Sequence, residues 1–92
     1  MARTPKTPKM LQTPERHRIL AAYAAREAEN LEWGARNPRF TEFERARYAG
    51  LARMKRRAQV YHTEAASLLE QGLAVPDWID WLLARDAASE RE

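Results

Sequence analysis

The chain has 92 residues, of which 45% are hydrophobic, and it contains no cysteine. That length suits one small domain, and the lack of cysteine excludes a disulfide framework or a cysteine-based metal site. The formal net charge of +3 is unevenly spread: residues 1–62 hold 14 Lys and Arg against 6 Asp and Glu, whereas residues 63–92 hold 2 against 7. This asymmetry is compatible with two different partners, with head-to-tail self-association, or with solubility alone.

The sequence has no apolar run long enough to cross a bilayer, and its first residues lack the apolar core of a secretory signal. We therefore expect a cytoplasmic protein without membrane contact. The apolar residues are mostly Ala and Leu, with few β-branched side chains, which favours helix over sheet. The predicted fold class is all-α.

Residues 1–12 contain three basic side chains, two prolines and no acid. Proline favours extended chain, so this segment is predicted to be a flexible basic arm ahead of a single helical domain at 13–92. Such an arm either lies along nucleic-acid phosphates or only improves solubility. The candidate phosphate contacts in it are Arg3, Lys6 and Lys9.

The first helix is predicted at about residues 14–33, because Thr13 is a suitable N-cap, Pro14 suits the first position, and Gly34 can end the helix. An acid, Glu27, lies in the middle of its apolar face. The expected members of that face are Ile19, Leu20, Tyr23, Ala24 and Leu31.

A long amphipathic helix at about residues 41–71 is the central element. Thr41 and Glu44 fit a capping box at its start, and Gly72 can take the left-handed conformation after its end. Its apolar residues recur in steps of three and four, at Leu51, Met54, Ala58, Tyr61, Ala65 and Leu68. A rod of about 46 Å cannot bury such a face alone. The same face would suit a coiled coil with a second copy, so a homodimer is one alternative.

Asn37-Pro38 breaks the chain between these helices, which should therefore pack as an antiparallel hairpin. With the turn near residue 37, Glu27 faces Arg47, the one base on the central apolar face. A lone buried charge is costly, so we predict a structural Glu27–Arg47 ion pair that fixes the register. A shorter helix at about 76–88 is expected to fold back over the central one.

Nothing in the sequence indicates catalysis, a cofactor or a metal. There is no Gly-rich phosphate loop, and no serine or threonine has an evident His/Asp pair. His17 and His62 lack metal-ligand spacing and are far apart in the predicted register, so we expect no joint site. The chain is predicted not to be an enzyme.

Two surfaces are candidates for binding. Trp81 and Leu83 lie on opposite edges of the C-terminal helix's apolar face, and both cannot be buried against one rod. They therefore form a candidate protein-partner surface, unless Trp81 packs over the first helix as core. On the central helix, the outward arginines could follow a phosphate backbone, although solvated helix faces look similar. These arginines are Arg45, Arg53 and Arg56.

Trp33 is expected to pack against Phe40 and cap the first loop. The leading functional hypothesis is a small non-catalytic adaptor or inhibitor that occupies a surface of a larger protein. Short helical proteins of this kind occur among accessory proteins of phages and mobile elements. The alternative is a nucleic-acid-binding protein that uses the basic arm and the arginine-rich helix face.

Overall fold

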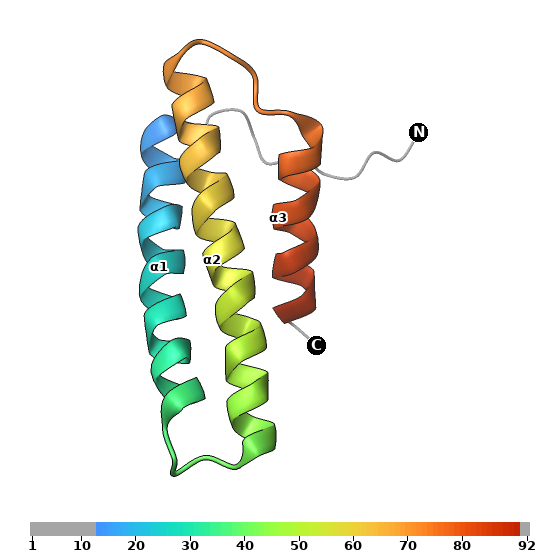
Figure 1. Cartoon of the computed structure of the whole chain (residues 1–92). Coiled ribbons are helices and arrows are strands. Elements are labelled where there is room, and N and C mark those ends of the chain that lie inside the picture. The colour runs from blue at the N-terminus through green and yellow to red at the C-terminus, as the bar shows by residue number, and fades with distance from the viewer. Residues whose placement is uncertain (1–12, 91–92) are drawn as a thin grey trace.

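The computed structural model of the protein describes residues 13–90, with side chains as far as Asp86. Within this part of the chain α1 spans Pro14–Arg36, α2 spans Glu42–Glu70 and α3 spans Asp77–Glu90. Figure 1 shows α2 between the other two helices, with α1 antiparallel to it and α3 returning along its C-terminal half. The predicted all-α architecture, a helical hairpin with a shorter return helix, is confirmed. The predicted basic arm at 1–12 lies outside the described residues.

The helix boundaries follow local signals in the sequence. Thr13 Oγ1 accepts a hydrogen bond from the Arg16 amide at 3.1 Å. At the start of α2 the capping box is complete, since Thr41 Oγ1 accepts from the Glu44 amide and the Glu44 carboxylate accepts from the Thr41 amide. Gly72, just after α2, has a φ of +75° and so ends the helix as predicted.

The contact between α1 and α2 is a seam of small residues. The buried residues of α1 include Ala21, Ala24, Ala28 and Gly34, and those of α2 are Ala52, Ala65 and Ala66. Among the described residues, the largest fully buried side chain is Ile79 of α3. The expected apolar face of α1 is therefore partly wrong, because Ile19 and Tyr23 are 49% and 61% exposed. Helices that meet on alanine turn their larger side chains outward.

The first helix does not end at Gly34 but continues to Arg36. Gly34 is buried where the two helices approach closely: a Cβ built on it would lie 3.0 Å from Cδ2 of Tyr48. The Tyr48 ring also contacts Phe40 edge-on, with ring centroids 5.0 Å apart. Trp33 does not cap this loop, since it is largely exposed.

The longer α1 shifts the register of the hairpin. Glu27 pairs with Lys55, whose Nζ lies 3.0 Å from the Glu27 carboxylate. Lys55 lies about two helical turns beyond Arg47, which is exposed. The predicted Glu27–Arg47 pair is therefore wrong, for two reasons: the turn is centred beyond residue 37, and Arg47 does not lie in the interface.

The length and composition of the helices also bear on membrane contact. In residues 13–90, no helix combines the length and the apolar character that crossing a bilayer requires.

The same substitution at two glycines, one with room for a methyl group and one in the seam, tests how closely α1 and α2 pack. Gly50→Ala should stabilise the protein by roughly 0.5–1 kcal/mol, because the new methyl meets only the end of Arg53, at 3.8 Å, and alanine favours helix. Gly34→Ala has the same propensity gain but forces the Tyr48 ring to move, so we expect a net loss of about 1 kcal/mol. Urea unfolding of the two variants measures both values. Equal effects would contradict close packing at Gly34.

Candidate functional site

Ion pairs join α2 to each of the other two helices. Arg56 of α2 donates two hydrogen bonds to the Glu32 carboxylate of α1, at 3.0 and 2.7 Å. These hydrogen bonds hold the pKa of the Glu32 carboxyl below its usual value. Arg57 donates in the same bidentate way to Asp86 of α3, at 3.3 and 3.1 Å. Each of the other two helices is thus attached to α2 by a bidentate arginine–carboxylate pair, here called an arginine–carboxylate fork.

An open groove of about 580 Å³ runs along α2 beside the end of α1. Its floor is apolar and consists mainly of small side chains: Ala35, Ala49, Ala52, Val60 and Tyr61. Its charged rim consists of Glu32, Arg36, Arg53, Arg56 and Arg57. We refer to these ten residues as the arginine groove. Arg56 and Arg57 are paired with Glu32 and Asp86, so the exposed Arg36 and Arg53 give the channel a net positive charge over an apolar floor.

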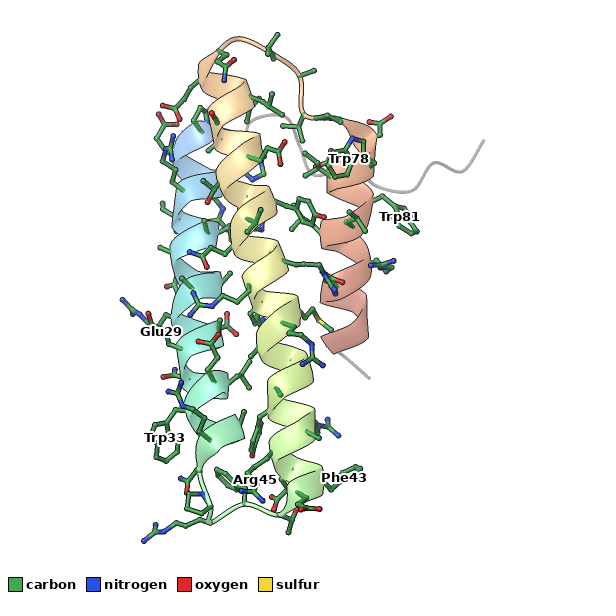
Figure 2. All side chains as sticks on the ribbon, in the orientation of Figure 1. Glu29, Trp33, Phe43, Arg45, Trp78 and Trp81 are labelled. Carbon is green, nitrogen blue, oxygen red and sulfur yellow. The ribbon has the colours of Figure 1, made fainter. Side chains whose placement is uncertain are left out.

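The outer face of α3 carries a second surface. Trp78, Trp81 and Arg85 are spaced by three and four residues and share one side of the helix, opposite the buried Ile79. Trp78 and Trp81 are 51% and 61% exposed, and Figure 2 shows Trp81 directed away from α2. The Arg85 guanidinium lies over the Trp81 ring, 5.1 Å from its centre. We refer to these three residues as the tryptophan stripe.

The two surfaces adjoin at Tyr61. This side chain lines the arginine groove, and its ring meets Trp78 edge-on with centroids 5.7 Å apart. Val60, the neighbouring floor residue, is 59% exposed. One continuous face of the molecule therefore combines arginines with solvent-exposed apolar and aromatic side chains, a composition found at interfaces.

Two histidines meet where the start of α1 packs against the C-terminal half of α2. The Nδ1 atoms of His17 and His62 are 2.9 Å apart, a hydrogen bond in which one Nδ1–H donates to the other, unprotonated Nδ1. His17 is 7% exposed, and its Nε2 is buried without a hydrogen-bond partner among the described residues. The expectation that these histidines lie far apart is wrong, because it depended on the incorrect register.

Burial removes the solvation of the charged imidazoles. It lowers the pKa of His17, although Asp80 of α3 opposes the shift. Burial, with the facing His17, lowers the pKa of His62 to about 4. Both rings are therefore neutral near pH 7. In residues 13–90 no group of three potential metal ligands is assembled.

The predicted site residues are spread over different parts of this surface. Trp81 is exposed, whereas Leu83 is half-buried. Arg53 and Arg56 both line the arginine groove, but Arg56 is engaged by Glu32. Arg45 is half-buried near the loop at the start of α2 (Figure 2). Arg3, Lys6 and Lys9 lie outside the described residues.

The sequence analysis did not single out Arg36 and Arg57 of the arginine groove, or Trp78 and Arg85 of the tryptophan stripe. The signal for Trp78 was its spacing from Trp81 and Arg85, which marks a common face. No local pattern indicated Arg36, because its position depends on the continuation of α1 through Gly34.

The histidine pair predicts a specific pH dependence of stability. The pKa of His62 is near 6.5 in the unfolded chain and about 4 in the folded protein, so the unfolded state binds more protons between these values. Stability should be complete above pH 6.5 and fall as the pH drops toward 4. We expect a loss of roughly 1–2 kcal/mol, less than the pKa difference alone implies because solvent reaches His62.

The measurement is chemical unfolding at a series of pH values, compared with a His17→Phe/His62→Phe double variant. That variant should lose most of the slope between pH 4 and 6.5. An unchanged slope would assign the acid sensitivity to the carboxylates.

No family model matches the chain, and comparisons with curated proteins and with solved structures find no significant similarity. The proposal for its function therefore depends on the geometry of these surfaces.

Proposed function

We propose that the protein is a non-catalytic binding module that acts as an adaptor or inhibitor by placing the tryptophan stripe against a larger protein. The observation that carries this proposal is the exposure of Trp78 and Trp81 on one side of α3. Tryptophan and arginine are the residues most enriched at the energetic centres of protein interfaces, and the stripe contains only these two types.

The position of α3 in the fold supports the same proposal. The opposite side of this helix already supplies the packing that attaches it, through the fully buried Ile79 and the Arg57–Asp86 fork. The stripe is therefore not needed to hold α3 in place, apart from the Tyr61–Trp78 contact. Two exposed tryptophans would otherwise be an aggregation liability for a small monomer.

A nucleic-acid partner is the second candidate, favoured by the arginine groove. Arg36, Arg53 and Arg56 lie along one channel, and the alanine floor permits a close approach. In that case the affinity should fall steeply with salt, and removal of one contacting arginine should lower the salt slope by about one phosphate equivalent. The apolar floor gives a phosphate backbone no donors, which is why we place this candidate second.

The test compares two tryptophans of equal exposure. Trp33 and Trp81 are both 61% exposed but lie on opposite sides of the molecule, on α1 and α3 (Figure 2). Tagged protein captures its partner from native-host lysate, with nuclease, at low and high salt. Trp81→Ala should weaken capture about tenfold or more, and Trp33→Ala should leave it unchanged. Circular dichroism should show the same helix content for both variants.

Two outcomes would reject the proposal. An equal loss of capture with both variants would indicate non-specific binding by exposed tryptophan. Capture of nucleic acid that salt removes, with no protein retained after nuclease treatment, would favour the second candidate.

A further inference from the structure

The chemistry of the arginine groove indicates which kind of surface would fit it. Its floor, with the exposed Val60 and three alanines, requires an apolar ligand surface for good packing. Two of its guanidiniums, those of Arg56 and Arg57, already donate in the plane to Glu32 and Asp86. Their edges are thus engaged, which leaves fewer donors for phosphates and keeps the planar faces available for aromatic rings.

A ligand that suits this groove is an aromatic helix face flanked by acids. Indole rings would cover the apolar floor and stack on guanidiniums, while nearby carboxylates would meet the positive rim. The stacking is already seen within the protein, where the Arg85 guanidinium lies over the Trp81 ring. Helices commonly bind in grooves through side chains spaced by three and four residues.

The chain itself displays such a face. Asp77 is exposed and lies one turn before Trp81 on the same side of α3, whereas Asp86 is buried and already held by Arg57. In the groove, Glu32 and Asp86 pair with Arg56 and Arg57, and the exposed Arg36 and Arg53 supply the remaining positive charge. The stripe cannot fill the groove of its own molecule beyond the contact at Tyr61, because Trp81 is directed away from α2 (Figure 2).

We propose that two copies of the chain associate by docking the tryptophan stripe of each into the arginine groove of the other. Stripe and groove adjoin at Tyr61, so a two-fold axis near this residue would allow both contacts to form at once. In such a dimer the tryptophan stripe would be buried in the interface. It differs from a coiled coil of two α2 helices, since it uses the outer side of α2 and the outer side of α3 together.

This inference uses the same stripe as the proposed function, but it concerns the purified chain alone, so the two can fail separately. Sedimentation velocity over a wide concentration range should show a monomer–dimer equilibrium that weakens with salt. Trp81→Ala and Arg53→Glu should each raise the dissociation constant about tenfold or more. Arg53 is suitable because it is exposed and its replacement leaves both arginine–carboxylate forks intact.

Matched controls exist for both substitutions. Trp33→Ala removes an equally exposed tryptophan, and Arg39→Glu makes the same charge change at an exposed position in the loop. Neither should alter the dissociation constant.

Mixing provides the decisive arm. The Trp81→Ala chain keeps an intact groove, and the Arg53→Glu chain keeps an intact stripe. Each alone has no complete contact, but an equimolar mixture can form one of the two, so it should dimerise more strongly than either variant by itself. A sample that is monomeric at every concentration would overturn the proposal, as would a dimer insensitive to both substitutions or a mixture without rescue. If the wild type is monomeric and binds labelled duplex DNA, and Arg53→Glu abolishes that binding, the groove is a nucleic-acid site instead.

Discussion

Close approach of α1 and α2 along a seam of alanine and glycine is the constraint on which the rest of this structure depends. A helix that contacts its neighbour through Ala21, Ala24 and Ala28 buries little apolar area at each contact. The gain is in dispersion contacts between backbones and small side chains, which require the helices to lie near one another. The seam therefore fixes the register tightly, because any larger residue that entered it would separate the helices.

The seam also determines what the surface contains. Side chains too large for it are turned outward, and with α2 in the middle of a layer only 17 Å thick they have little else to pack against. This explains why a chain with an ordinary hydrophobic content leaves all three of its tryptophans largely exposed. Helix caps and the bidentate arginine–carboxylate forks, such as Arg56 with Glu32, add to the stability that the seam provides.

Much of the fold could be predicted from the sequence, because helix starts and stops are local. Thr41 with Glu44 and the glycine at 72 act within one turn, and their geometry does not depend on the rest of the chain. The register could not be predicted in this way. Gly34 looks like a helix end but is a site of close packing against Tyr48, and only the partner helix distinguishes these two roles. From that one misassigned residue followed the false Glu27–Arg47 pair and the failure to bring His17 and His62 together.

The candidate site was harder to predict because it consists of residues that the seam excludes. Apolar periodicity identifies a helix face but does not say whether that face is buried. In α1 a stripe of small residues lies beside a stripe of large ones, and packing selected the small one, so Tyr23 is exposed and Ala24 is buried. A rule that favours the largest apolar residues as core gives the opposite result.

The attachment of α3 links the two surfaces physically. Arg57 and Tyr61 belong to the arginine groove, and the same two residues hold Asp86 and Trp78 of α3. A ligand that moved either side chain would act directly on the helix that presents the tryptophan stripe. Asp80, on that same helix, partly offsets the lowering of the His17 pKa by burial, so α3 also bears on the ionisation of His17. Few contacts attach α3 to α2, and the alanine seam between α1 and α2 does not depend on them. A partner can therefore move α3 at a lower energetic cost than either of the other two helices.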